Sequence, residues 1–251
     1  MAYTKRFDGR KNDELRPMIV KAGVIKKADG SAYFKIGNTE CFASVYGPRD
    51  LNPRFLQNPK KGIIRCHYNM LPFSGTGSRI RPGNKRRSQE ISMVMEKALN
   101  PVVDLTAYPN TVVDIYIEFP QTDAGTRCAA ISAASIALAD AGIRMKEMVS
   151  SVAMGEVDGT VVADLTYAEE AFDGIVSDIP VAMVNSTQEI TLLQMDGEIT
   201  KKALIESLNA AKAATAKIHV LQEAALKAKY AGAKTSAKVA NAQTKPVEGS
   251  Q

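Results

Sequence analysis

Residues 121–143, QTDAGTRCAAISAASIALADAGI, decide the fold, because a helix-forming stretch here follows directly on a strand-like run. From Val113 to Phe119 apolar residues alternate with polar or less apolar ones, which is the two-residue period of a half-buried strand. Residues 125–141 are then mostly alanine and serine, a composition that predicts a helix able to lie very close to its neighbours. A strand that leads into a closely packed helix is therefore the centre of the predicted fold.

The sequence on either side of this centre divides into two successive halves of strands followed by helices. We expect an α+β fold in which mixed sheets pack with helices over residues 1–230, with a possible division near 147. Residues 231–251 contain almost no large apolar side chain, which predicts a flexible tail. Strands are expected at 18–24, 31–36, 41–46, 63–71, 150–155, 160–166, 181–184 and 189–193, and further helices at 88–105 and from about 200 to about 230.

Composition excludes several classes of function. No run of roughly 18 apolar residues is present and no apolar segment follows the charged N-terminus, so we expect a cytoplasmic protein without a membrane span. Cys41, Cys66 and Cys128 are far apart, which argues against disulfides and a zinc knuckle. With only His67 and His219 in the chain, histidine-based catalysis is disfavoured as well.

Three stretches are candidates for chemistry. Gly125, Thr126 and Arg127 lie where a strand gives way to a helix, and free N–H groups at a helix start can bind a phosphate. An ordinary helix entry capped by Asp123 is the alternative, and from spacing alone it is the commoner case.

The second candidate is the basic loop at 74–87, which ends in Arg86 and Arg87 and could hold successive phosphates; the alternative is a solvated loop. The third is the acidic stretch 169–178, whose carboxylates could hold Mg²⁺ or move a proton, although a surface loop is commoner. No complete phosphate-binding or dinucleotide-binding glycine motif can be placed near Gly75, so an ATPase or a dehydrogenase is not expected.

Several blocks together resemble the RNase PH family, most closely the catalytic RNase PH-like subunits of archaeal exosomes. The blocks follow one another in the family's order over nearly the whole chain. They are RFDGRKNDELRP (6–17), KAGVIKKADGSAYFKIGNTECFASVYGPRD (21–50), RCHYNMLPFS (65–74), KRRSQEIS (85–92), QTDAGTRCAAISAASIALADAGI (121–143) and SDIPVAM (177–183). The resemblance implies an RNase PH-type fold, like domain 2 of ribosomal protein S5, and a 3′-to-5′ phosphorolytic exoribonuclease that releases nucleoside diphosphates and can run in reverse as a tailing enzyme.

The resemblance also implies roles for single residues. Gly125, Thr126 and Arg127 would bind inorganic phosphate, the co-substrate, and Arg86 and Arg87 would hold the phosphates at the RNA 3′ end. Four further residues would contact RNA. These are Arg65 on its backbone, Tyr68 as a stacking surface, and Lys60 and Lys61 in a loop that resembles the lining of a pore entry.

The acidic stretch departs from the family pattern. Relatives carry two aspartates six residues apart, whereas the best match here is Glu170 with Asp178 eight residues later. These two residues are the expected catalytic carboxylates and ligands of a Mg²⁺ ion. Asp173 between them is a possible substitute ligand.

The implied partners are the 3′ ends of single-stranded RNA, an inactive RNase PH-like paralogue that alternates with this chain in a hexameric ring, and RNA-binding cap subunits. The chain would then be active only with its paralogue. Two alternatives are a non-catalytic RNA-binding ring subunit and a self-sufficient homohexameric RNase PH that trims transfer RNA ends. The altered acidic spacing favours the former, and the intact 125–127 and 86–87 stretches favour chemistry.

Overall fold

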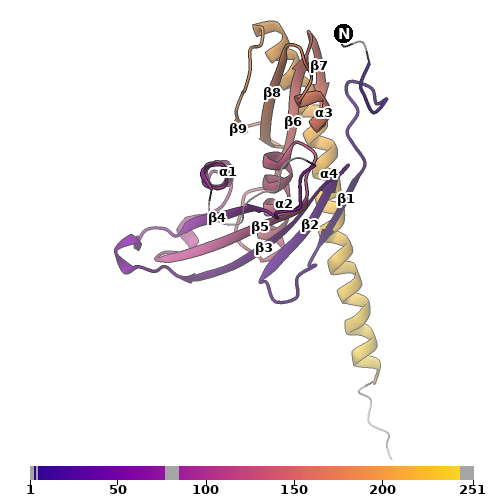
Figure 1. The fold of residues 1–251 in the computed structure, drawn as a ribbon. Coiled ribbons are helices and arrows are strands. Elements are labelled where there is room, and N and C mark those ends of the chain that lie inside the picture. The colour runs from indigo at the N-terminus through magenta and orange to yellow at the C-terminus, as the bar shows by residue number, and fades with distance from the viewer. Residues whose placement is uncertain (1–2, 4, 77–84, 244–251) are drawn as a thin grey trace, which may run out of the picture.

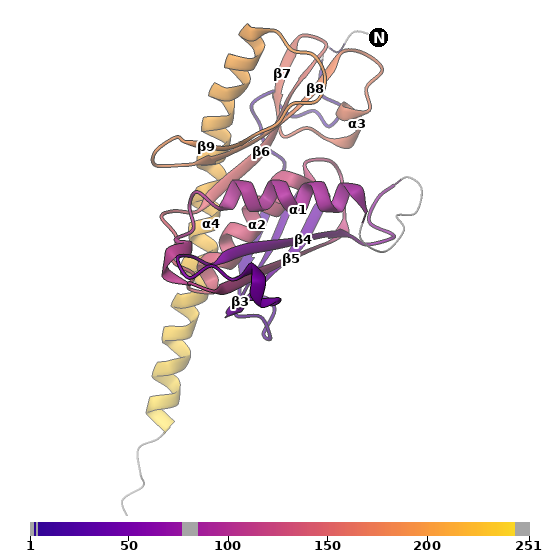
Figure 2. The same cartoon turned by 90° about the vertical axis from the view of Figure 1, so that its left-hand side faces the viewer.

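The fold is built from two β-sheets with helices between and beside them, as a computed structural model shows (Figures 1 and 2). The structure describes residues 3, 5–76 and 85–243, with side chains up to residue 231. Within these residues, no helix is long and apolar enough to cross a membrane. The α+β class predicted from the sequence is confirmed.

The first sheet has five strands in the described residues. They are β1 (Met18–Ala22), β2 (Gly30–Ile36), β3 (Thr39–Asp50), β4 (Ile63–Met70) and β5 (Thr111–Gln121). Their order across the sheet is β1-β2-β3-β5-β4, and only β4 runs parallel to its neighbour. The alternation expected in β5 places Ile115, Ile117 and Phe119 in the core with no exposed surface.

The second sheet is antiparallel and has four strands in the described part. They are β6 (Val149–Val157), β7 (Thr160–Ala163), β8 (Val176–Val184) and β9 (Ile190–Leu193), in the spatial order β7-β6-β8-β9. β8 starts five residues earlier than the predicted 181–184, and this extension carries Asp178 out of the expected loop into a strand. The reason is pairing with β6, which runs from Val149 opposite Val184 to Val157 opposite Val176.

Helices complete the two layers. They are α1 (Arg86–Leu99), α2 (Thr126–Asp140), α3 (Tyr167–Glu170) and α4 (Lys201–Gln243), with short 3₁₀ turns at Arg54–Leu56 and Leu105–Ala107. Helix α2 lies between the sheets, against β2 and β3 on one side and β6 and β8 on the other, and α4 runs alongside both (Figure 1).

The small side chains of α2 allow the close approach expected from the sequence. A Cβ atom added to Gly30 in β2 would lie 2.3 Å from the Ala137 carbonyl oxygen and 2.2 Å from the Ala141 nitrogen. Larger residues on this face of α2 would push the helix off the sheet. The burial of α2 on nearly all sides follows from this contact, together with its second contact to the other sheet.

Two predicted helix limits were wrong. Helix α1 covers Arg86–Leu99 and not 88–105, because Pro101 cannot supply the N–H that a continuing helix needs. Helix α4 does not end near Tyr230 but continues to Gln243. The flexibility predicted for residues 231–251 stays a prediction. Alanine and lysine favour helix even where there is no apolar face to bury, which is why composition placed the boundary too early.

Candidate active site

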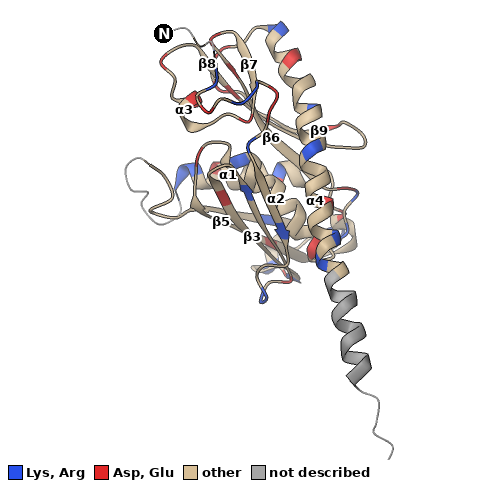
Figure 3. Cartoon of the chain, turned by 90° about the vertical axis from the view of Figure 1, so that its right-hand side faces the viewer, with Lys and Arg blue, Asp and Glu red and all other residues tan. Residues whose placement is uncertain are grey.

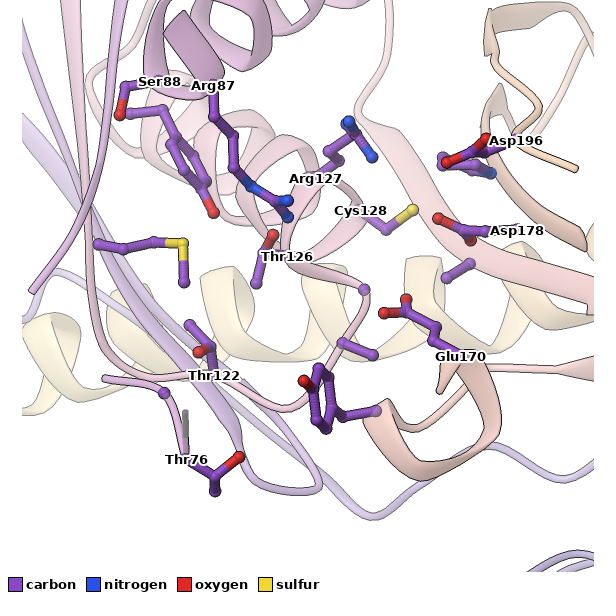
Figure 4. Close-up of a pocket in the computed structure, with 18 of the residues that line it drawn as sticks. Thr76, Arg87, Ser88, Thr122, Thr126, Arg127, Cys128, Glu170, Asp178 and Asp196 are labelled. Carbon is purple, nitrogen blue, oxygen red and sulfur yellow. The ribbon is translucent and has the colours of Figure 1, made fainter. Parts of the chain in front are cut away.

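A cavity of about 790 Å³ lies where the two sheets meet. Its walls come from the end of β4, the first turn of α1, the turn that precedes α2, helix α3, and strand β8 with the loop at 196–197. The segments predicted to carry chemistry are therefore brought together, although they are far apart in the sequence. Figure 4 shows their side chains pointing into this space, and Figure 3 shows how Lys, Arg, Asp and Glu are distributed over the chain.

The turn before α2, which we call the anion turn (residues 123–126), has an unusual backbone. Ala124 and Gly125 both adopt left-handed conformations, with φ angles of 56° and 65°. Only glycine adopts this region without strain, so the alanine must be held there by its surroundings. Gly125 is the N-cap of α2, and its neighbours Thr126 and Arg127 also line the cavity.

The start of α2 has no side-chain cap from the described residues, so the predicted alternative of a helix entry capped by Asp123 is not what the structure has. The Asp123 carboxylate accepts hydrogen bonds from the Tyr167 N–H at 3.0 Å and from the Asn38 amide at 3.2 Å instead. Within the described part of the chain, no hydrogen bond is formed by the first N–H groups of α2, so they can bind an anion in the cavity. This arrangement favours a phosphate cradle over an ordinary capped helix entry.

Two arginines supply positive charge to the cavity. Arg127 extends from the first turn of α2 and Arg87 from the first turn of α1, and both point inward (Figure 4). Arg127 donates a hydrogen bond to Glu90 at 3.2 Å, while its buried Nε has no partner among the described residues. Arg86 is exposed and does not line the cavity, so of the predicted pair only Arg87 does. Arg79 and Arg81 of the basic loop lie outside the described residues.

Carboxylates face the arginines across the cavity. Burial raises the pKa of Glu170 to about 7, helped by the nearby charge of Asp178 and opposed by Arg87. Burial likewise raises the pKa of Asp178 to about 6, against the opposing charge of Arg127. Both acids therefore change protonation near neutral pH, which is the range useful for proton transfer.

Asp173 does not join this pair. It is exposed and absent from the cavity walls, and its assignment as a substitute for the first carboxylate stays a prediction. In the described residues, no three His, Cys, Asp or Glu side chains are grouped closely enough to hold a metal ion by themselves. Within the same part of the chain, however, the buried Oδ1 of Asp178 has no hydrogen-bond partner, and Glu170 faces the same cavity. This pair of oxygen donors fits Mg²⁺, which keeps several waters and bridges to substrate phosphates.

Asp196 and Glu90 were missed by sequence reasoning. Asp196 lines the cavity because its backbone pairs with that of Asp178 through two hydrogen bonds of 2.9 Å. Glu90, which lies in α1, accepts the hydrogen bond from Arg127 and another from Gln194 at 3.3 Å. Asp196 lies outside the quoted sequence blocks, and Glu90 lies within KRRSQEIS but gains its role only through the tertiary contact with Arg127.

The residues predicted to contact RNA differ in how exposed they are and in where they lie relative to the cavity. The Tyr68 ring is only 4% exposed and packs against Phe119, so it borders the cavity without offering an open stacking face. Arg65 points to the other face of β4, where it pairs with Asp114 at 2.6 Å. Lys60 and Lys61 are exposed on the loop before β4, away from the cavity.

The fold and the cavity define a class: α+β proteins in which two sheets enclose a cavity lined by a helix start, arginines and acids. The chain belongs to the 3′ exoribonuclease family. The family's domain 1 matches residues 14–144 and its domain 2 matches residues 147–214.

Curated relatives and solved structures agree with this assignment. The chain is 48% identical over 227 residues to "Exosome complex component Rrp41" of Methanopyrus kandleri, covering 90% of this chain and 94% of the relative. The protein of the same name from Thermococcus kodakarensis is 48% identical over 226 residues, with 90% of each chain covered.

Among solved structures, rice Rrp46 superposes with a TM-score of 0.78 at 25% identity, over 88% of this chain and 100% of that one. A chain from the Archaeoglobus fulgidus exosome with RNA bound to the active site gives a TM-score of 0.73 at 22% identity. It covers 86% of this chain and 91% of its own length, and at this identity the likeness shows the shared fold.

Proposed function

We propose that this chain is the catalytic subunit of an RNA exosome and shortens RNA from its 3′ end by phosphorolysis. One observation carries the proposal: the free helix start with Arg127 and Arg87 faces Glu170 and Asp178 across a single cavity. Such a site can hold two phosphates together and has acids that change protonation near neutral pH. The names of the curated relatives support the assignment to an exosome.

The reaction joins a phosphate oxygen to the phosphorus of the last phosphodiester bond. The bond from this phosphorus to the 3′ oxygen of the preceding nucleotide breaks, which releases a nucleoside diphosphate. The freed 3′ oxygen takes up a proton and becomes the new end of the RNA. In the reverse direction the same steps add a nucleotide from a nucleoside diphosphate.

The roles of the residues follow from their positions. The N–H groups at the start of α2, with Thr126 and Arg127, hold inorganic phosphate, and Arg87 holds the RNA phosphate beside it. Asp178 and Glu170 face these anions, and protonated carboxyl groups at this place can donate to the leaving 3′ oxygen. Mg²⁺ bound by the two carboxylates would supply further neutralisation of phosphate charge.

The proposed enzyme is an assembly of this chain with partner subunits. The catalytic chain alternates with an inactive paralogue in a hexameric ring, and RNA-binding cap subunits guide single-stranded RNA to it. Arg86, Lys60 and Lys61 are exposed outside the cavity, where they can contact RNA on its way in. We place this assembly in the cytoplasm, in keeping with three buried cysteines that are free thiols.

The test uses the chain mixed with its paralogue and a single-stranded RNA. Wild-type enzyme should release nucleoside diphosphates with phosphate present and none in chloride of equal ionic strength. Asp178→Asn and Arg127→Lys should each lower turnover roughly 100-fold or more while the ring stays intact by size measurement. Asp173→Asn is the matched control, because this carboxylate is exposed and outside the cavity, and it should keep full activity.

The same experiment separates the alternatives. A non-catalytic ring subunit would show no phosphate-dependent release in any variant. A self-sufficient RNase PH would form a catalytic hexamer without the paralogue. Undiminished turnover by Asp178→Asn would remove the proposed site even if the chain is an enzyme.

A further inference from the structure

The anion turn is supported from behind by two side chains. The Asp123 carbonyl oxygen accepts hydrogen bonds from the Arg16 guanidinium and, at 2.9 Å, from the Thr39 hydroxyl. The Ala124 carbonyl also lies 2.8 Å from the Thr39 hydroxyl oxygen. The carbonyl side of the turn is thus bound to the N-terminal segment and to β3, while the residues that follow open onto the cavity.

Arg16 is itself rigidly held. Its Nε and Nη2 donate to the two carboxylate oxygens of Asp164 at 2.9 and 2.6 Å, and its backbone N–H donates to the same carboxylate at 2.8 Å. The side chains are only 5% and 3% exposed. A paired guanidinium held in this way has little freedom to move, so its remaining N–H can fix the Asp123 carbonyl in place.

Arg16 lies directly behind the glycine of the turn. A Cβ atom added to Gly125 would lie 3.5 Å from Arg16 Nη2. Arg16 is nevertheless absent from the cavity walls, so it does not touch a ligand bound there. Its contact with a bound anion is therefore indirect, through the backbone of the turn.

We propose that Arg16, fixed by Asp164 and assisted by Thr39, is a positioning residue that holds the anion turn in its phosphate-binding shape. The inference rests on the proposed function for the identity of the anion. It explains why Ala124 keeps a left-handed backbone that alanine seldom adopts. The Asp123 and Ala124 carbonyl groups, before and after the Ala124 Cα, both accept hydrogen bonds. It also assigns part of the N-terminal RFDGRKNDELRP block to the chemistry of the site.

Three variants test the proposal. Arg16→Lys keeps a positive charge beside Asp164, but one ammonium cannot also replace the guanidinium contact with the turn. Thr39→Val keeps the shape of a fully buried side chain and the Asp164 ion pair, but removes the hydroxyl. Arg10→Lys is the control, because Arg10 also pairs with Asp164, at 3.2 Å, while its hydrogen bonds within the described residues do not reach the turn.

The measurements are made on the ring assembled with the paralogue. Arg16→Lys should raise KM for phosphate about 10-fold, and Thr39→Val should raise it in the same direction, while KM for RNA changes less than about twofold. Arg10→Lys should leave both constants within about twofold. A purely structural role would lower the amount of folded enzyme and would not separate the two KM values. If Arg16→Lys fails to fold, Thr39→Val decides the matter.

Calorimetric titration of inorganic phosphate into the wild type and variants separates this inference from the proposed function. Phosphate binding by the wild type without nucleotide release would overturn the proposed function alone, and weaker binding by Arg16→Lys would still support the positioning role. Normal turnover with an unchanged KM for phosphate in Arg16→Lys and Thr39→Val would overturn the positioning role alone. An equal rise of KM in Arg10→Lys would overturn it as well.

Discussion

Glu170 and Asp178 share one wall of the cavity, and the charge of Asp178 makes Glu170 harder to ionise. Burial is the main cause of the raised pKa of Glu170, about 7, and the Asp178 carboxylate adds to it. A carboxyl group whose pKa is higher in the folded chain than in the unfolded chain destabilises the fold once it is ionised. The residues suited to proton transfer are thus maintained at a cost in stability.

Glu170→Gln should therefore stabilise the chain at high pH. Without phosphate and Mg²⁺, the wild type should lose stability as the pH rises from about 4.5 to 7, whereas the neutral variant should lose less, because only Asp178 of the pair still ionises there. The difference in unfolding free energy should be about 2 kcal/mol at pH 8 and close to zero near pH 4.5. Denaturant unfolding at both pH values measures it, with Asp173→Asn as an exposed control. Equal stability of wild type and variant at pH 8 would mean that Glu170 is not in a desolvated site.

Among single residues, the sequence predicted those that lie in local motifs and missed those that reach the cavity from distant parts of the chain. Gly125, Thr126 and Arg127 are consecutive, so a helix start with a phosphate-binding pattern could be recognised. Arg16 reaches the same turn from more than 100 residues away. Asp196 and Glu90 likewise depend on tertiary pairing, which no local pattern encodes.

Helix α3 is short, and its position depends on contacts outside it. Glu169 closes a capping box with Thr166 and is fully buried against Arg6, with an Nε to Oε1 distance of 2.8 Å. Burial acts to raise the pKa of Glu169, but hydrogen bonds from Arg6, the Thr166 backbone and Tyr3 outweigh it and lower the pKa to about 2. The Arg6 ion pair therefore anchors the helix that presents the next residue, Glu170, to the cavity.

Arg6→Met should destabilise the chain by roughly 3 kcal/mol, because it leaves the Glu169 carboxylate buried without its charged partner. The loss should be full above about pH 4.5 and should shrink as the pH falls toward 2, where Glu169 becomes protonated. Thermal unfolding as a function of pH gives this profile, with Lys11→Met as an exposed control in the same segment. A pH-independent loss would assign the effect to packing and not to the ion pair.

The contact between β2 and α2 leaves no room for a methyl group. Gly30→Ala should cost about 1–3 kcal/mol, since the new Cβ would meet backbone atoms of α2 that cannot move aside alone. Gly75→Ala is the matched control for stability, because its nearest neighbour would be 3.8 Å away. Denaturant midpoints compare the two, and an equally small effect at both positions would show that α2 can shift.

Elements differed in how well the sequence predicted them, for reasons seen in these contacts. Helix α2 was predicted within one residue at each end, because its alanine and serine run begins after a strand and ends near Gly142. The limits of α1 and α4 were missed because the prediction followed apolar spacing, which registers neither the stop at Pro101 nor the helix propensity of the alanines and lysines after residue 230. β8 was predicted too short because its first residues are ordered by pairing with β6.

For the whole molecule, the fold class and the two βα halves followed from the sequence, but the way the halves meet did not. The division near residue 147 stays a proposal. Helix α4 packs on strands of both sheets, and the fully buried Gln222 ties it to α2 and β6 through the Ser132 and Val149 carbonyls. Such long-range packing has no sequence period, yet it fixes the cavity between the halves.

Because both halves form the cavity walls, a bound phosphate should protect elements of both from opening. The anion turn and Arg127 belong to the first half, and they line the same cavity as Glu170 and Asp178 of the second. Ligand that binds only the closed cavity stabilises it by RT ln(1 + [L]/Kd), about 2.7 kcal/mol at 100 times Kd. Local opening that breaks the cavity should be suppressed by the same amount in α2 and in β8.

Hydrogen exchange with and without phosphate measures this coupling, with chloride of equal ionic strength as the control. Exchange should slow at the start of α2, in α3 and around Asp178, while β1, which lies outside the cavity walls, should change little. Arg127→Lys should weaken the protection in both halves together, because the two walls respond to one ligand. Protection confined to α2 would show instead that phosphate is held by the first half alone and that the acids of the second half reach it only when RNA is bound.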